Sequence, residues 1–349
     1  MVLTYKNNFV MFIDNIKRSR PLILFFIILI IAFFWLNPFN SYLATSVNCS
    51  NSFMPLNIMF LKLFPISSFS NKFISITLFI VLSLLISQFN FKYAIIPELT
   101  YMPSIIFVII SLSFSNVKDC SYISIIGILM LLIFELLINT YKKENLSYNI
   151  LNASIILGLS SLFYFNALFY IVFLVACLLT LRPFFWREWI FLILGIIINY
   201  YFFFTIGYLG NYDFLAFFQN INNIFHTHIH ISFTFLQKIQ FFIFCISTLI
   251  ASFFLLVRLG SFKILVRKIH NLLFLLFLNS VAIIILIPYS GNEIFVMVSM
   301  ASSLLISNYF IYSKQKKIKS IIFLLMIIVF FSIQFEKFIP PGLVEFFRF

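Results

Sequence analysis

The sequence predicts an all-α membrane protein, built as a polytopic bundle of about eleven transmembrane helices. Of its 349 residues, 63% are hydrophobic and only 9% are charged, whereas charged residues make up about a quarter of an ordinary soluble domain. Long apolar runs recur along the whole chain, and each approaches the roughly 20 residues that a helix needs to cross a bilayer. Composition and run length together favour a membrane protein.

The apolar runs favour helices over a transmembrane β-barrel. Barrel strands alternate apolar and polar residues over about ten positions, but runs such as 21–36 and 321–333 are nearly continuous in Ile, Leu, Phe and Val. Because no water satisfies the backbone in lipid, such a run must form its hydrogen bonds within itself, as a helix does.

The predicted spans follow the apolar runs in chain order. The split at 165–166 leaves almost no loop, so the alternative for 149–181 is one long hairpin with a broken or re-entrant tip. The spans are 21–36, 73–89, 101–114, 121–139, 149–164, 166–181, 189–206, 239–257, 271–288, 294–311 and 320–335.

Basic residues predict the orientation of these spans. With a cytoplasmic N-terminus and alternating spans, most of the 23 Lys and Arg residues fall on the cytoplasmic side, as expected for a membrane protein with its N-terminus inside and its C-terminus outside. The chain 1–349 is then a single integral-membrane domain with a cytoplasmic lead at 1–20. Two longer outer segments, 37–72 and 207–238, are expected at the membrane interface. Residues 262–270 resemble them, as a basic amphipathic lead into the next span.

The net charge of +13 does not indicate nucleic-acid binding, because the positive residues form short clusters between apolar runs. The lipid bilayer is the predicted partner. Cys49 and Cys120 both fall on the predicted outer side, where a disulfide is chemically permitted. Cys177 and Cys245 fall inside spans and are expected to pack there as small apolar residues.

Glu135 is the clearest ionisable residue inside a predicted span, where a charge costs roughly 2.5–3.5 kcal/mol. Two interpretations are open. Glu135 reaches the nearby cytoplasmic interface and pairs with Lys142 or Lys143, or it lines a polar cavity. The second interpretation makes it a candidate for catalysis or transport, with Asn279 and Asn308 as further polar residues inside spans.

Asp213 and Glu293 are candidate catalytic residues because both fall on the predicted outer face. The Ser-Gly-Asn turn before Glu293 also explains that residue as a helix cap. Glu98 follows Pro97 at the start of the third span, where a Pro-Glu pair suits the first helical turn.

His226, His228 and His230 are candidate metal ligands. On an extended strand, alternate residues point the same way and all three imidazoles would converge; on a helix they would spread around the cylinder. His270 is predicted on the other side of the membrane. No fixed fourth ligand accompanies the run, so the sequence assigns no metal and no cofactor.

Arg182, Arg187 and Glu188 are candidate binding residues in the turn at 181–189. Each also has a structural explanation. The arginines are cytoplasmic-side anchors, the tryptophans in the turn belong to the interfacial aromatic belt, and Glu188 caps the next helix or pairs with an arginine. We expect this turn to be a structural hinge.

The same turn carries a resemblance. The motif Leu-Arg-Pro-Phe-x-x-Arg-Glu-Trp at 181–189, followed by Ile-Leu-Gly at 193–195, resembles a signature of a family of polytopic inner-membrane proteins of Gram-negative bacteria with a domain of unknown function. The likeness extends through 152–159 and 293–295. It implies a polytopic fold and brings no established activity.

A second resemblance concerns architecture. About eleven spans, a cytoplasmic N-terminus and a long first outer segment are similar to the C-superfamily membrane glycosyltransferases, which use polyprenyl-phosphate sugars. Those enzymes place an Asp or Glu in the first outer loop as general base, but 37–72 contains neither. Asp213, Glu293 or Asp119 would have to replace it.

Three functions follow as hypotheses. The first is a glycosyltransferase-like membrane protein that handles a polyprenyl-linked or other lipid substrate at the outer face. The second is a transporter or flippase, for which Glu135 is the main candidate residue. The third is a non-catalytic partner in envelope assembly, which needs no site.

Overall fold

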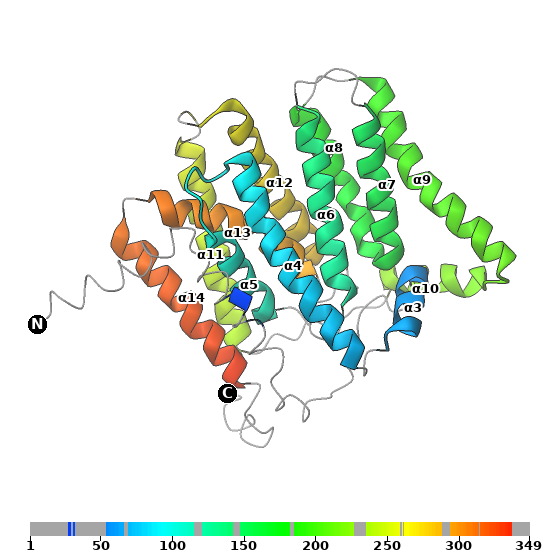
Figure 1. Ribbon diagram of the computed structural model, residues 1–349, viewed down its shortest axis with the longest axis horizontal. Helices are drawn as coiled ribbons and strands as arrows, with labels where there is room; N and C mark the ends of the chain where they lie inside the picture. Colours follow the sequence, from blue (N-terminus) through cyan, green and yellow to red (C-terminus); the bar gives the residue numbers. More distant parts are fainter. Residues whose placement is uncertain are drawn as a thin grey trace, which may run out of the picture.

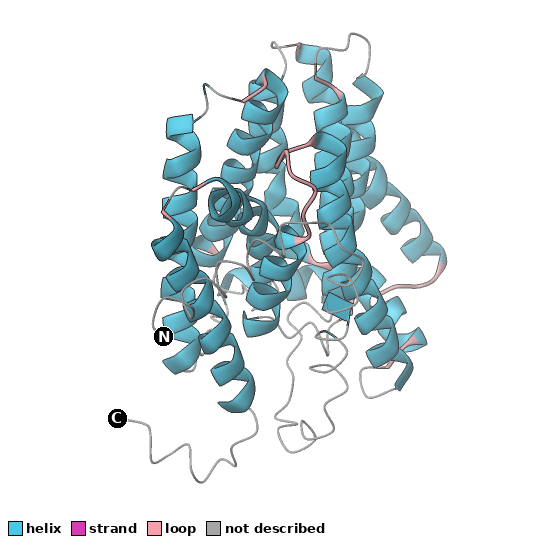
Figure 2. Cartoon of the chain, turned by 60° about the vertical axis from the view of Figure 1, so that its left-hand side comes forward, coloured by secondary structure: helices cyan, strands magenta, loops and turns pink. Residues whose placement is uncertain are grey.

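The computed structural model describes residues 27, 28, 31, 54–65, 69–114, 121–141, 147–181, 185–226, 235–258, 260, 262–287, 294–313 and 315–336. Within these residues the chain forms twelve α-helices, α3 to α14, and one short 3-10 helix, η2, with no strand among them (Figure 2). The predicted all-α class is confirmed for this part of the chain.

The helices follow the predicted runs in order, and most of them stand side by side as an elongated bundle (Figure 1). Their bounds are α3 Pro55–Leu63, α4 Phe69–Tyr93, α5 Met102–Phe114, α6 Tyr122–Asn139, α7 Ser147–Phe163, η2 Phe165–Tyr170, α8 Ile171–Leu181, α9 Trp186–Leu209, α10 Phe214–His226, α11 Phe235–Arg258, α12 Ile264–Leu286, α13 Phe295–Tyr312 and α14 Lys316–Glu336.

Six helices of the described chain are long and apolar enough to cross a membrane: α4, α6, α9, α11, α12 and α13. Helices α5 and α7, and the segment formed by η2 and α8, are apolar but shorter. The chain is therefore a helical protein with several candidate membrane spans. The number of eleven spans and the orientation of the N-terminus stay predictions.

Several helices are longer than the apolar runs that predicted them. Helix α4 begins four residues before the predicted span 73–89 and ends four residues after it. Helix α12 begins at Ile264, so 262–270 is not a separate interfacial lead, because most of it forms the first turns of that helix. Polar and basic residues at the helix ends remain helical beyond the apolar stretch, since their own side chains can reach water.

The region 149–181 is a hairpin with almost no loop. Tyr164 alone separates α7 from η2, and its backbone is extended. The chain then continues from η2 into α8 without a break. Asn166 lies buried in η2 and donates from Nδ2 to the Tyr164 hydroxyl at 3.1 Å. The predicted break at 165–166 is confirmed, with a 3-10 turn as its form.

The centre of the bundle is occupied by α13, which has every residue from Phe295 to Ile311 buried. It packs against α5, α6, α11 and α12, and α5 is itself almost entirely buried. The serines of α13 donate to carbonyls one turn back on the same helix, as Ser299 does to Val296 and Ser302 to Val298, both at 2.8 Å. Such bonds satisfy a hydroxyl that has no water nearby.

Helix α9 lies at the outer edge of the bundle and packs along α7 (Figure 1). Small residues bring the two helices close together. Ser154 donates both to Leu151 O on its own helix, at 2.8 Å, and to Phe191 O across the interface, at 3.1 Å. Asn199 adds a bond from Nδ2 to Ile155 O at 2.9 Å. The rest of α9 leaves most of its apolar side chains exposed.

The two ends of the bundle differ in charge. The C-terminal ends of α4, α6, α8 and α11 and the N-terminal ends of α7, α9 and α12 lie toward its upper end in Figure 1. We call this the basic end; it carries Lys92, Arg187, Arg258, Lys263 and Lys268. Helices α3 and α10, from the predicted outer segments, lie at the opposite end. Their contact with a membrane interface stays a prediction.

Candidate functional site

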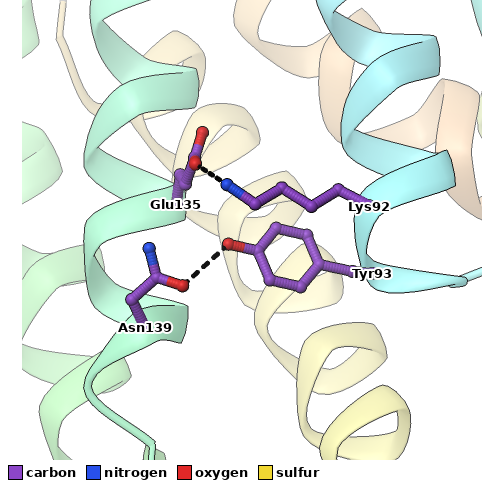
Figure 3. Close-up of polar contacts among 4 residues, drawn as sticks. All are labelled: Lys92, Tyr93, Glu135 and Asn139. Atoms are coloured by element: carbon purple, nitrogen blue, oxygen red, sulfur yellow. Dashed lines mark hydrogen bonds and ion pairs between the residues drawn. The ribbon is translucent and has the colours of Figure 1, made fainter.

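An ion pair joins two neighbouring helices near the basic end. Lys92 in the last turn of α4 donates from Nζ to Glu135 Oε1 on α6 (Figure 3). Next to this pair, the hydroxyl of Tyr93, the residue after Lys92, donates to Oδ1 of Asn139, which lies four residues after Glu135, at 3.1 Å. Two polar contacts therefore link the ends of α4 and α6 in parallel.

The helix geometry explains why these residues meet. Helices α4 and α6 pack against each other and run in the same direction, since α5 returns between them. Glu135 lies four residues before the end of α6, or about 6 Å along its axis. The long side chain of Lys92 starts almost at the end of α4 and bridges the remaining distance.

Glu135 also lines an open groove of about 440 Å³ between α6 and α7. The groove combines two kinds of surface, a polar edge and an aliphatic wall. Asn152 shares the polar edge with Glu135, because it lies five residues into α7, at a depth of about 7 Å from the same end. The full lining is Leu132, Glu135, Leu136, Asn152, Ile155 and Ile156.

The polar groups at this edge keep unused hydrogen-bonding capacity. The Lys92 side chain is 55% exposed and that of Glu135 is 33% exposed. Within the described chain, the second carboxylate oxygen of Glu135 has no hydrogen-bond partner. The exposed Asn152 amide has none there either. The site can therefore accept a ligand without first breaking the contacts of Asn152.

Glu135 shows features of both interpretations of the sequence. It forms an ion pair, and it also lines a groove. Its partner is Lys92, which the sequence reasoning did not consider; Lys142 and Lys143 lie outside the described residues. The position of Lys92 along its span could have identified it as the partner. Lys92 and Glu135 each precede the end of their span by about one turn or less, and the two spans run in the same direction.

Asp213 has a structural task at the other end of the bundle. It is exposed and precedes α10, where its Oδ1 accepts from the backbone N–H groups of Leu215 and Ala216 at 3.0 and 3.1 Å. This is the geometry of a helix N-cap. Burial, and then the negative charge of Asp213, raise the pKa of the adjacent Tyr212 above its ordinary value. The groove does not include either residue.

Most of the other predicted site residues cannot be placed relative to one another, because they lie outside the described part of the chain. Glu293, Arg182, His228 and His230 lie outside the described residues, as do Asp119, Cys49 and Cys120. His226 ends α10, and its side chain is not described either. In the described chain no three His, Cys, Asp or Glu residues gather as metal ligands. Arg187 is exposed at the start of α9, whereas Glu188 is buried.

A buried polar contact between α12 and α13 was not predicted as a pair. His270 of α12 bonds Val266 O through Nδ1 at 2.8 Å, which assigns the proton to Nδ1. Its Nε2 then accepts from Asn308 Nδ2 of α13 at 2.9 Å. The same amide points to Ile95 O in the non-helical segment before α5, at 3.4 Å. Glu98 lies in this segment and not in the first turn of α5, which begins at Met102.

The turn at 181–189 carries the resemblance to a family of inner-membrane proteins that the sequence indicated. Of the motif in this turn, Leu181 and residues 185–189 are described, and residues 182–184 lie outside the described part. Both resemblances stay predictions. No protein-family model, no curated protein and no solved structure matches this chain.

Proposed function

We propose that this chain is an integral membrane protein that binds an amphipathic lipid from the side, in the groove between α6 and α7. The observation that supports this is the combination of surfaces in one groove. Leu132, Leu136, Ile155 and Ile156 offer an aliphatic wall, and Glu135 with Asn152 forms a polar edge. A lipid presents the same two kinds of surface, a polar head and an apolar chain.

The depth of the polar edge supports the proposal. Glu135 and Asn152 lie between one and one and a half helical turns, about 6–7 Å, from the basic end, a depth at which we expect the headgroup region of a bilayer to meet its hydrocarbon. A charge at the centre of a spanning helix costs roughly 2.5–3.5 kcal/mol, and part of this cost remains for an exposed carboxylate near the end of the helix. A bound headgroup would provide polar contacts at this level and offset that cost.

The size of the groove suits one chain segment of a lipid. Its volume of about 440 Å³ lies within the roughly 300–1,000 Å³ of small-molecule sites in proteins. Because it is open along one side, a ligand can enter from the bilayer without leaving it. Lateral entry of this kind requires no aqueous path through the buried helices α5 and α13.

The experiment is lipid photo-crosslinking of the full chain in vesicles. A photoreactive acyl chain should label α6 and α7, as mapped by peptide mass spectrometry. Leu132→Trp fills the groove and should reduce that labelling several-fold. Leu249→Trp is the matched control, because Leu249 is an exposed leucine of α11 outside the groove. Equal labelling of the Leu132→Trp and Leu249→Trp variants would refute lipid binding in this groove.

The outer-face hypothesis concerns different residues. A glycosyltransferase-like activity on a polyprenyl-linked sugar would rest on Asp213 or Glu293. The capping bonds of Asp213 give that residue a sufficient structural explanation. Glycosyltransfer therefore stays a separate prediction, and lipid binding at the basic end depends on neither acid.

A further inference from the structure

We propose that the groove selects a zwitterionic lipid whose headgroup carries both a phosphate and a primary amine. This inference rests on the proposed lipid binding and adds the chemical class of the headgroup. It starts from two charges in direct contact, the Glu135 carboxylate on the polar edge and Lys92 of α4, which lies beside that edge and is not one of the six lining residues. Their sum is zero, so the site complements a headgroup that is itself neutral but charge-separated.

The two charges can be matched one by one. Lys92 has spare ammonium hydrogens and a side chain that is 55% exposed, so it can donate to a phosphate oxygen while it still contacts Glu135. The second oxygen of Glu135 can accept from an ammonium group. The Asn152 amide, exposed on the facing helix, can bind either part of the headgroup.

The carboxylate argues against lipids that carry only negative charge. A phosphate drawn to Lys92 comes close to Glu135, because the two side chains touch. With an amine in the same headgroup, Glu135 gains a charge-assisted hydrogen bond. Without an amine, it faces like charge in a medium that screens poorly. An anionic lipid is therefore expected to bind more weakly than a zwitterionic one.

The lining of the groove argues for a primary amine over a quaternary one. A trimethylammonium group has no N–H to donate to Glu135, and proteins recognise it with aromatic rings. None of the six lining residues is aromatic. A primary ammonium group, in contrast, donates directly to a carboxylate, and such a charge-assisted bond is roughly twice as strong as a neutral one.

The experiment measures binding of three lipids with identical acyl chains to the purified full chain in detergent, by native mass spectrometry. The probes are phosphatidylethanolamine, phosphatidylcholine and phosphatidylglycerol. We expect phosphatidylethanolamine to bind about tenfold more tightly than the other two, which is the effect of one additional charge-assisted hydrogen bond. Equal affinities, or a preference for phosphatidylglycerol, would overturn the inference.

Two variants separate the roles of the charges. Glu135→Gln should lower the affinity for phosphatidylethanolamine to that for phosphatidylcholine. Lys92→Gln should weaken all three phosphate lipids. The matched control Lys62→Gln removes an exposed lysine of α3, outside the groove, and should change none of them.

The exchanged variant Lys92→Glu/Glu135→Lys covers the case in which a single variant fails to fold. It keeps the pair and its zero net charge, so the preference for phosphatidylethanolamine should persist; loss of the preference in a folded exchanged variant counts against the inference.

Failure of the headgroup preference is distinct from failure of lipid binding itself. If Leu132→Trp leaves all binding unchanged, the groove is not the lipid site, whereas a site blocked by Leu132→Trp without headgroup preference refutes only this inference.

Discussion

Gly195 of α9 lies directly against Ser154 of α7. A Cβ atom on Gly195 would be 1.9 Å from Ser154 Oγ and 2.9 Å from the backbone oxygen of Leu151. No side chain other than hydrogen fits there, and the close approach allows Ser154 to reach Phe191 O. The contact between these two residues sets the distance between α7 and α9, and α7 also provides one wall of the groove.

Gly195→Val should therefore destabilise the docking of α9. Overpacking at a tight contact costs about 1–3 kcal/mol, and here the backbone of Leu151 cannot move aside as a flexible side chain would. The measurement is thermal unfolding in detergent. Gly260→Ala is the control, because a Cβ atom there meets nothing within 4 Å. A Gly195→Val variant as stable as the control would contradict the tight contact.

The His270–Asn308 pair should behave as a coupled unit. Asn308→Leu leaves the buried Nε2 of His270 without its donor, and an unsatisfied buried polar group costs about 1–3 kcal/mol. Replacing both partners by leucine removes the polar atoms together and should cost less than the sum of the two single variants. A double-mutant cycle of unfolding free energies measures this coupling. If the losses of unfolding free energy in the two single variants add up to the loss in the double variant, His270 and Asn308 are not energetically coupled.

Two substitutions at Asp213 distinguish a structural role of this residue from a catalytic one. Asp213→Ala removes the N-cap of α10 and should destabilise that helix by about 0.5–2 kcal/mol. Asp213→Ser keeps a capping oxygen but has no carboxylate, so it should retain the amide protection of α10 in hydrogen exchange. If Asp213→Ser is folded but abolishes an activity that the wild-type protein has, the catalytic prediction for Asp213 gains support.

Tyr212 provides a prediction about pH. Burial and the charge of Asp213 raise its pKa in the folded protein above the ordinary value of 10.0. The folded state therefore holds this proton more tightly than the unfolded chain does. Its contribution to stability is complete below pH 10 and is lost as the pH rises through the raised pKa.

Asp213→Asn should move the pKa of Tyr212 part of the way back, since it removes the charge and leaves the burial. Asparagine also caps a helix as well as aspartate does, so α10 should be retained. Ultraviolet titration of the variant and of wild type, each with Tyr212→Phe subtracted, measures the shift. A pKa that is unchanged by Asp213→Asn would assign the whole effect to burial.

Helix positions could be predicted from the sequence because apolar run length determines them. The run before Phe89 and the run around Glu135 both became helices of the predicted type. Helix ends were less predictable, since the chain stays helical past the apolar residues, as at Ile264. Apolar run length does not distinguish a residue that faces lipid from one that faces another helix, so the exposure of α9 and the burial of α13 could not be predicted from it.

The candidate site was predictable only in part. Glu135 stood out because a charge inside an apolar run is expensive. Its partner was not identified, because Lys92 lies on α4, with the whole of α5 between it and α6 in the chain, and is adjacent only after packing. Asn152 gave no signal, since one asparagine in an apolar helix is unremarkable until the structure brings it beside Glu135.

The complete enclosure of α13 also affects how the protein is made. Among the six candidate spans it has the lowest mean hydropathy, 1.5, because its serines and Asn308 replace aliphatic residues. Helices enter a bilayer one after another during synthesis, and a less apolar helix enters lipid less readily. Helices α5, α11 and α12 are all synthesised before α13. The assembled earlier helices therefore form the environment that receives α13, and a defect in any of them should appear first as failed insertion of the central helix.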